Sequence, residues 1–464
     1  MTHSPALLKG TALALAAAVA FLTTPRAAEA IPAFARMHQV PCTTCHVAFP
    51  KLNHFGEEFE HRGFRMPGQA GKYLWEQPVP LAGRINVLAS GETNRWTPQL
   101  STNDQWNSDK SGLSLFDWQL LTGGTLAPDV SFFGQVVGKV QGLGPDDSDA
   151  DAEHTDHGTT TIRTEVLWVQ LNDVRGDDGT MNLRLGIDHV DNHFLSTPLR
   201  LTHADYLIQI QPGHIGASLH PLAVGMGLNG SLHDYGLDYD IGIRNYSPFY
   251  DSNEGDEHRL GAFYAVLNKR LAEHTVSFLF TEDRSGNANL NEDGVTLGWG
   301  VSLDVRIGRL EFIPGLYWYR DYSGGSGGDT GTDPGTDPGT DPGTDPDHDH
   351  DGGTTGHAES FSGGLGVFSG TLGVTYQFKP TLLGTLRYDF NDFDVKDEAV
   401  NRAARQYVAS LAWYQHPNVR WITEVTRLDT TNLAMSGEPG LASLVTADSS
   451  LTQNKYIVRL DVGF

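Results

Sequence analysis

The chain has 464 residues, of which 53 are Gly, and its formal net charge at pH 7 is −25. Such an acidic protein is a poor partner for nucleic acid, because the phosphate backbone is itself a dense row of negative charge. The high glycine content, with many aromatic residues and few long apolar runs, favours strands and turns over helices. The length allows two or three ordinary domains, or one large all-β domain with a small appendage.

The first thirty residues have the pattern of a secretory signal peptide. Lys9 precedes the apolar run 11–22, and Ala28-Glu29-Ala30 is a suitable cleavage site. The apolar run is too short for a membrane-spanning helix, which needs about 20 residues. We therefore expect residues 1–30 to be removed on export.

Both cysteines of the chain lie just after this leader. Cys42 and Cys45 are followed directly by His46, and this C-T-T-C-H spacing is that of c-type haem attachment. A thioredoxin-like pair would need a βαβ context, a zinc site would need two further ligands, and a bare disulfide would leave His46 unexplained. The sequence therefore predicts one covalently attached haem c, bound through Cys42 and Cys45, with His46 as an iron ligand.

Several residues could provide the second iron ligand. The candidates are methionines and histidines of the same segment: Met66, His61, His54, Met37 and His38. Met37 and His38 lie too close before Cys42 to wrap comfortably over the distal face. Residues 57–64 predict a short helix that closes at Gly63, and Met66 follows that turn. Met66 is the preferred ligand on this reasoning, and His61 and His54 stay open as alternatives.

From residue 79 to the end, apolar and polar residues alternate. In 295–307 the odd positions are apolar and the even positions are small, polar or charged, as in Asp304 and Arg306. A period of two places these sets on opposite faces of a strand. The run of thirteen residues is long enough to cross a membrane as a tilted strand, which takes about 9–11 residues.

The same alternation recurs in later and earlier segments: 130–140, 382–390, 405–414 and 455–464, the last ending on Phe464. A soluble β-sandwich or propeller also alternates, but its core would not contain Arg387, Asp389 and Arg459. A water-filled barrel lumen would contain them. Short polar turns near 126–131 and 378–382 fit the same architecture. We therefore predict an all-β fold, a transmembrane antiparallel β-barrel of about 16 strands, with fourteen or eighteen left open.

Two connections are strongly acidic. Residues 145–157 are rich in Asp and Glu, and residues 324–357 repeat T-D-P-G and end in an Asp- and His-rich run. The second cannot bury apolar surface, so we predict a disordered, solvated loop. Weak cation capture is the alternative, with oxygen and imidazole ligands from Asp345, Asp347, His348, Asp349, His350 and Asp351.

The stretch IPAFARMHQVPCTTCH, followed by FPKLNHFGEEFEHRGFRM, resembles the N-terminal module of outer-membrane monohaem cytochrome–porin fusions. In that family a single c-type haem precedes a porin-like barrel, and the best-known members are associated with extracellular ferrous iron oxidation. The resemblance covers 31–66 alone. It implies electron transfer across the outer membrane of a Gram-negative-type bacterium, between an extracellular donor such as ferrous iron and periplasmic electron carriers. The T-D-P-G repeat is not a feature of that family.

Together these observations predict four parts: a signal peptide (1–30), a small, mostly helical haem module (31–68), a linker (69–78) and a barrel in the lipid bilayer (79–464). So short a module cannot build much of a core alone. We therefore expect it at or inside the periplasmic end of the barrel, as a plug. The alternatives are a solute porin that the module plugs or gates, and a periplasmic haem-binding β-protein. No hydrolase or transferase motif is present, so an oxidoreductase role means electron transfer only.

Overall fold

The computed structural model describes thirteen parts of the chain: 33–48, 51–98, 106–140, 160–188, 194, 201–204, 206–207, 223–245, 260–283, 296–321, 365–395, 402–431 and 449–464. The predicted signal peptide and the acidic connections 145–157 and 324–357 lie outside these residues. Among the described residues, no helix is both long and apolar enough to cross a membrane.

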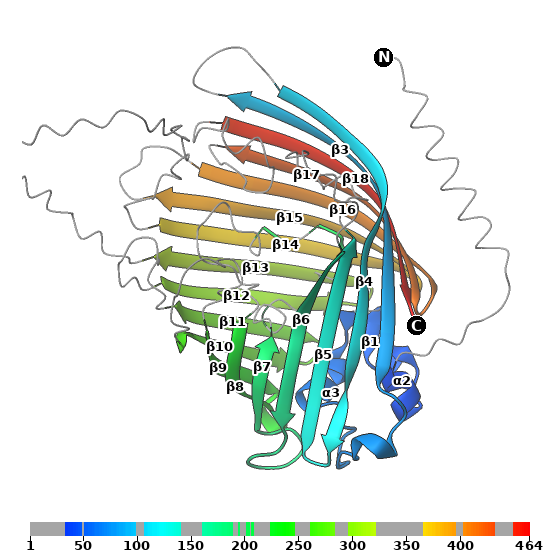
Figure 1. Cartoon of the computed structure of the whole chain (residues 1–464). Coiled ribbons are helices and arrows are strands. Elements are labelled where there is room, and N and C mark those ends of the chain that lie inside the picture. Colours follow the sequence, from blue (N-terminus) through cyan, green and yellow to red (C-terminus); the bar gives the residue numbers. More distant parts are fainter. Residues whose placement is uncertain are drawn as a thin grey trace, which may run out of the picture. The chain divides into compact units, whose positions relative to one another are not determined.

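Sixteen antiparallel strands form one closed barrel, as the alternation predicts (Figure 1). The first, β3, pairs with the last, β18, and every other strand pairs with its neighbours in the chain. The strands are β3 (Leu81–Pro98), β4 (Trp106–Ala127), β5 (Val130–Val140), β6 (Thr160–Leu171), β7 (Asn182–Asp188), β8 (Ala223–Leu232), β9 (Leu237–Asn245), β10 (Leu260–Leu271), β11 (His274–Asp283), β12 (Thr296–Ile307), β13 (Leu310–Asp321), β14 (Leu365–Lys379), β15 (Leu382–Val395), β16 (Arg402–His416), β17 (Val419–Thr431) and β18 (Ser449–Gly463).

The two faces of the barrel wall differ as the alternation predicts. In β12, Trp299 is exposed on the outer face, whereas Ser302 and Asp304 are buried on the inner face. In β15, Leu386 points outward and is 64 % exposed, while its neighbour Arg387 is 3 % exposed. The outer face is therefore apolar, and the inner face carries the charges.

One end of the barrel has short connections. Two-residue turns join β4 to β5, β10 to β11, β12 to β13, β14 to β15 and β16 to β17. The first and last strands meet at this end too, where Gly83 and Phe464 exchange two backbone hydrogen bonds of 2.7 and 2.9 Å. We call it the short-turn end.

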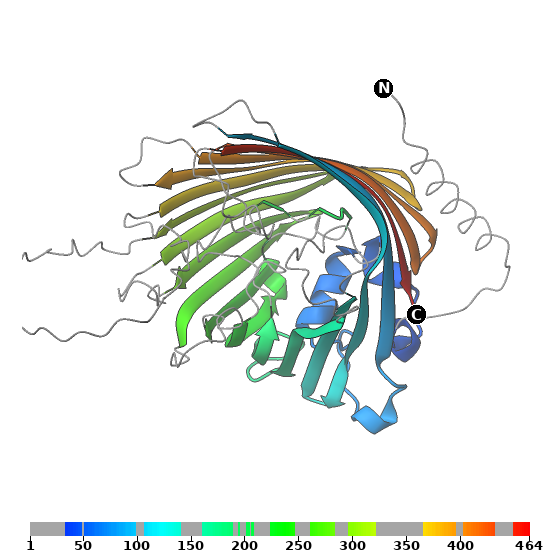
Figure 2. The same cartoon turned by 45° about the horizontal axis from the view of Figure 1, so that its top comes forward.

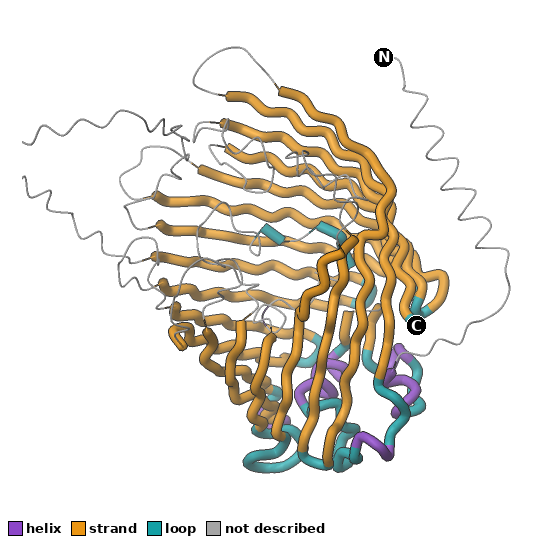
Figure 3. Tube along the Cα trace, in the orientation of Figure 1, coloured by secondary structure: helices purple, strands orange, loops and turns teal. Residues whose placement is uncertain are grey.

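The residues before β3 form a segment of short elements, which we call the N-terminal segment (33–80). Its elements are α2 (Ala33–His38), the 3₁₀ turn η1 (Cys42–Thr44), the paired strands β1 (His46–Ala48) and β2 (Lys51–Leu52), α3 (His54–His61) and the 3₁₀ turn η2 (Leu74–Glu76). Only α2 and α3 of these elements are α-helical; Figure 3 draws them in purple together with the 3₁₀ turns. The segment is thus less helical than expected, because a two-stranded sheet stands between its helices. Both views in Figures 1 and 2 place α2 and α3 beside the barrel strands at the short-turn end.

Candidate functional site

The CTTCH motif folds as a tight turn. Thr44 donates its backbone N–H to Pro41 and Cys45 donates to Cys42, at 3.0 and 3.2 Å. Cys42 and Cys45 are half-buried and are not joined as a disulfide. Burial raises the pKa of both thiols, which keeps them protonated near pH 7.

Helix α3 is held on this turn by two residues of its first turn. Asn53 caps the helix, because its Oδ1 accepts the Gly56 N–H at 2.9 Å. The Asn53 backbone N–H donates to Cys45 at 2.8 Å, and its side-chain amide donates to Thr44 at 3.0 Å. A Cβ on Gly56 would overlap the carbonyl oxygen of Cys45. The helix can therefore lie against the CTTCH turn only with glycine at this position.

The other end of α3 closes with the glycine that the sequence predicts. Gly63 has φ +64°, and its N–H donates to Glu60 at 2.9 Å. The Phe64 N–H donates to Phe59 at 2.8 Å, and the two rings lie 5.8 Å apart. These bonds form a Schellman motif with its hydrophobic contact. The chain leaves the helix at a fixed angle, which directs Phe64 toward the barrel wall.

An aromatic cluster joins the N-terminal segment to that wall. Phe64 stacks on Phe34 at 4.5 Å and on Trp168 of β6 at 5.6 Å, and lies 5.8 Å from Phe133 of β5. Phe59 completes the buried centre of the cluster. Cys45, Phe55 and Met66 pack against the same cluster.

These residues fit a covalently attached haem. The two thiols are not bonded to each other, and one of them borders an aromatic surface of the kind that a porphyrin would contact. A nearby imidazole, His38, has a buried Nε2 with no hydrogen-bond partner among the described residues. Sulfur and imidazole donors beside apolar side chains are the donor set that c-type haem needs.

The predicted iron ligands lie in different places. Met66 packs against the aromatic cluster, and the ring of His38 meets Phe59 edge-on at 5.2 Å. His54 donates from Nδ1 to Glu57 at 3.3 Å, a hydrogen bond that raises the pKa of His54. His61 is buried at the end of α3, and its carbonyl accepts hydrogen bonds from the wall.

The remaining candidate groups are His46 and Met37. His46 begins β1, where it pairs with Leu52. The Met37 side chain lies over Gly124 of β4. His38 is half-buried, and burial lowers the pKa of its imidazole, which keeps the ring neutral near pH 7.

Ion pairs fasten the N-terminal segment around the inner wall. Arg65 pairs with Asp173 at 2.6 Å and Arg62 with Asp178 at 3.1 Å, both in the β6–β7 connection. On other strands, Arg270 of β10 pairs with Glu58, and Glu311 of β13 pairs with Lys51. Lys51 is only 1 % exposed, and Arg62 and Arg65 are also buried. The segment thus inserts three buried cations against acidic groups of the barrel.

Backbone groups of the segment are tethered as well. Gln170 and Asn182 donate side-chain hydrogen bonds to the His61 carbonyl at 3.1 and 2.8 Å, and Ser131 donates to the Gly63 carbonyl at 2.6 Å. The expected linker is also docked, because Lys72 exchanges two hydrogen bonds with the Thr125 hydroxyl. The chain from α3 to β3 therefore follows the wall closely.

A second piece of chain lies inside the barrel. The inner segment, which comprises Phe194, 201–204 and 206–207, belongs to the β7–β8 connection. The Glu424 carboxylate accepts the backbone N–H groups of His203 and Ala204 at 2.7 and 2.8 Å. Arg387 donates to Thr202 at 2.9 Å. Leu201 and Ala48 of β1 share one buried cluster with wall residues Leu383, Ala412, Tyr414 and Ile422.

The contacts of the N-terminal segment thus run from β4 and β6 to β10 and β13, and its cluster with the inner segment reaches β15–β17. Ala48 and Leu201 lie near the short-turn end, whereas Phe194 packs farther along the strands, in a cluster with Val266, Leu279 and Tyr317.

Some residues of this site escape sequence reasoning. Asp173, Asp178 and Glu311 belong to the many acidic residues of the chain, and nothing local marks them as docking partners. Trp168 and Phe133 do carry a signal, because they place large apolar groups on a face that is otherwise polar. Residues 166–171 are apolar at five of six positions, a pattern of strands covered on both faces.

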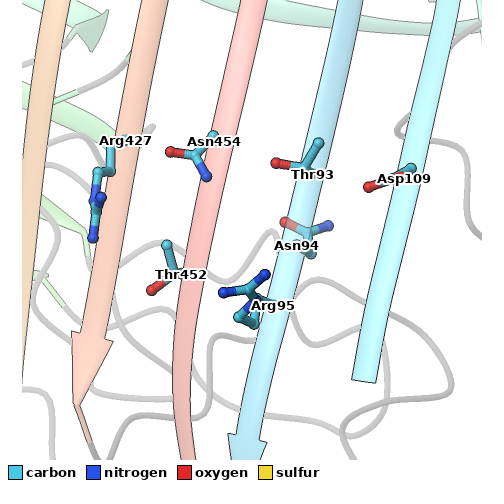
Figure 4. A pocket seen from close by; sticks show the side chains of 7 residues that line it. All are labelled: Thr93, Asn94, Arg95, Asp109, Arg427, Thr452 and Asn454. Atoms are coloured by element: carbon cyan, nitrogen blue, oxygen red, sulfur yellow. The ribbon is translucent and has the colours of Figure 1, made fainter. Parts of the chain in front are cut away.

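A polar pocket of about 530 Å³ lies far from this site, near the opposite end of the same strands (Figure 4). Its lining comes from β3, β4, β17 and β18: Thr93, Asn94, Arg95, Asp109, Arg427, Thr452 and Asn454. Within the described parts of the chain, no three His, Cys, Asp or Glu side chains gather closely enough to hold a metal ion. The predicted cation-capturing residues 345–351 lie outside those parts.

No protein-family model and no curated protein matches the chain. Solved structures do match its fold. An anion-selective porin from Comamonas acidovorans aligns with 83 % of this chain and 99 % of its own, at 12 % identity and a TM-score of 0.51. The outer membrane channel DcaP of Acinetobacter baumannii aligns with 82 % and 97 %, at 13 % identity and a TM-score of 0.50. The chain therefore has a porin-like β-barrel fold.

Replacing Gly56 by Ala is expected to loosen the N-terminal segment, because the added Cβ would overlap the Cys45 carbonyl. Asn53→Ala should weaken it by about 1 kcal/mol through loss of the helix cap. Limited proteolysis of the full chain in detergent measures this as faster cleavage within 33–80. The matched control is Gly91→Ala, since a Cβ there meets open space. Equal protease resistance of Gly56→Ala and the unmodified protein would contradict this account.

Docking of the N-terminal segment on the barrel should weaken in acid, because Glu58 becomes protonated. Burial opposes its ionisation, but the hydrogen bond and charge of Arg270, with Arg62, lower the pKa of Glu58 below its ordinary value of 4.5. A lowered pKa adds stability above the unfolded-state pKa, and this stability is lost as pH falls through the folded-state pKa. The protease sensitivity of 33–80 should therefore rise below pH 4.5. In Glu58→Gln it should be higher at neutral pH and change less on acidification; an unchanged profile would remove Glu58 from the docking contacts.

Proposed function

We propose that this protein is a porin-like barrel of the outer membrane whose N-terminal segment plugs the lumen and carries one covalently attached haem c. The observation that supports the plug is the ring of buried contacts between the segment and the inner wall. Charged pairs at β10, β13 and the β6–β7 connection hold it from several sides. The inner segment adds a second barrier, which extends from Leu201 near the same end to Phe194 farther along the strands.

The orientation follows from the connections. Outer-membrane barrels have short turns on the periplasmic side and longer loops outside the cell. The short-turn end, and with it the N-terminal segment, then faces the periplasm. The apolar outer face, with residues such as Leu386 and Trp299, faces lipid.

This arrangement favours a closed or gated channel over an open solute pore. In a planar bilayer the unmodified protein should conduct little. Lys51→Glu should raise its conductance, because it places a second buried carboxylate against Glu311, and a buried charge is costly unless an opposite charge lies beside it. Lys51→Met is the matched control: it keeps the side-chain length, and Glu311 still pairs with Arg306 at 3.0 Å.

A large open conductance of the unmodified protein would contradict the plug. So would equal conductance of Lys51→Glu and Lys51→Met.

Electron transfer is the second candidate function, and one observation favours it. The CTTCH thiols lie beside an aromatic cluster that extends from the segment into the wall. When bound, haem supplies a site that takes up and releases one electron at a time. Cys42 and Cys45 would attach it, His46 would bind its iron, and the cluster would exclude water from it. The proposed donor is extracellular ferrous iron or another reduced species, and the proposed acceptors are periplasmic carriers.

Haem attachment and iron oxidation are tested separately. The full chain should retain haem stain on a denaturing gel, and Cys42→Ala/Cys45→Ala should lose it, because both thioether bonds are absent. Added ferrous iron should then convert the visible spectrum of the oxidised protein to that of the reduced form. Absence of stain would overturn the haem, whereas a stained protein that stays oxidised under a favourable potential would overturn only the iron donor.

A further inference from the structure

This inference rests on the proposed haem: we infer that His38 would bind its iron as the second protein ligand, together with His46. Four other side chains of the segment compete for this role: Met37, His54, His61 and Met66. The geometry of α2 and α3 separates them.

Helix α3 turns two of the histidines away from the attachment site. Successive residues of an α-helix are rotated by about 100°. Gly56 marks the side that touches Cys45, and Phe59 lies about 60° from it. His54 and His61 lie about 160° and 140° from Gly56 on the same wheel.

The observed contacts of α3 agree with these positions around the helix axis. The Nε2 atom of His54 is also buried without a hydrogen-bond partner among the described residues, so the position of His54 on the helix is what separates it from His38. His54 Nδ1 is held by Glu57, and Glu58 on the same side of the helix pairs with Arg270 of the wall. The His61 carbonyl is tied to Gln170 and Asn182. That side of α3 is the docking side.

Helix α2 reaches the attachment site because the chain reverses after it. Gln39 has φ +54°, a left-handed conformation that is unfavourable for a non-glycine residue. This reversal lets α2 pack back on the aromatic cluster, where Phe34 stacks with Phe64. Proximity to Cys42 in the chain therefore does not keep His38 away from the haem site. Strain of this kind persists where the surrounding structure maintains it, often at functional sites.

The two ring nitrogens of His38 are in different environments, as in a metal-binding imidazole. The ring hydrogen-bonds the backbone of Phe64, whereas Nε2 is inaccessible to solvent and has no hydrogen-bond partner among the described residues. A buried polar atom without a hydrogen-bond partner destabilises the fold, because it has lost its bonds to water. Metal-binding imidazoles show this pattern: one nitrogen is fixed by a carbonyl and the other is left for the metal.

The two methionines lack such a requirement. Met37 covers Gly124 of β4, so its thioether lies on the wall. Met66 packs against the aromatic cluster. Its thioether is stable in apolar surroundings and needs no hydrogen-bond partner or metal there. The unsatisfied His38 Nε2 therefore decides between His38 and Met66, and reverses the preference drawn from the sequence.

The experiment uses the full-length oxidised protein in detergent, with electron paramagnetic resonance, visible spectroscopy and haem stain. The unmodified protein should be low-spin with two imidazole ligands and should lack the sulfur-to-iron charge-transfer band. His38→Gly should lose the low-spin signal, keep its haem stain, and recover the signal when free imidazole is added. His38→Met should gain the sulfur-to-iron band. Met66→Leu, which removes the competing sulfur at nearly equal volume, should leave the spectrum unchanged.

The opposite results would overturn the assignment: loss of the low-spin signal in Met66→Leu, or its persistence in His38→Gly. A stained protein with a sulfur-to-iron band in its unmodified form would also overturn His38 while leaving the haem in place. Absence of haem stain in the unmodified protein would overturn the proposed haem and this ligand together.

Discussion

The buried charge on the inner wall is the constraint on which the rest of this structure depends. Closing the sheet turns one apolar face outward, so the charged positions of every strand converge inside. A buried charge is costly unless an opposite charge lies beside it. The wall supplies some partners itself, as in the pair of Arg420 with Asp461. Other acidic groups at the short-turn end, Asp173, Asp178 and Glu311, have partners in the N-terminal segment: Arg65, Arg62 and Lys51.

Helix α3 links this docking to the CTTCH motif. It has only eight residues, too few to be stable alone in water. One side lies on the CTTCH turn through Gly56, another carries Phe55 and Phe59 to the aromatic cluster, and a third presents Glu58 to Arg270. Each side depends on a partner outside the helix. A change in any one contact therefore shifts the position of the helix against the other two.

The barrel was predictable because its signal repeats. Strand after strand places apolar residues at every second position, and the observed sixteen strands, their faces and the turns near 128 and 380 agree with that prediction. The helix end at Gly63 was predictable for a similar reason, since a glycine after a short amphipathic run is a local signal.

The docking partners were not predictable, because they depend on contacts distant in the chain. Arg270 lies 212 residues from Glu58, and no periodicity connects them. For the site around Cys45, the sequence predicted only the residues of the motif itself. Phe133 and Trp168 lie on barrel strands far along the chain, and the motif gives no sign of them. The chain reverses at Gln39, which is not a glycine, so the sequence contains no signal for this reversal. From the sequence alone, His38 therefore lies too near Cys42 to be preferred as an iron ligand.

These long-range contacts change how the CTTCH motif should be regarded. Taken by itself, the N-terminal segment is too short to enclose the proposed haem. In the fold, part of the aromatic cluster belongs to the barrel, because Val166, Trp168 and Phe133 close the side that the segment leaves open. Phe64 lies between the two parts: its backbone forms a hydrogen bond with the His38 ring, and its own ring stacks on Trp168. The proposed attachment site is therefore complete only when the segment is docked, so that a haem bound there would share its surroundings with the wall of the lumen.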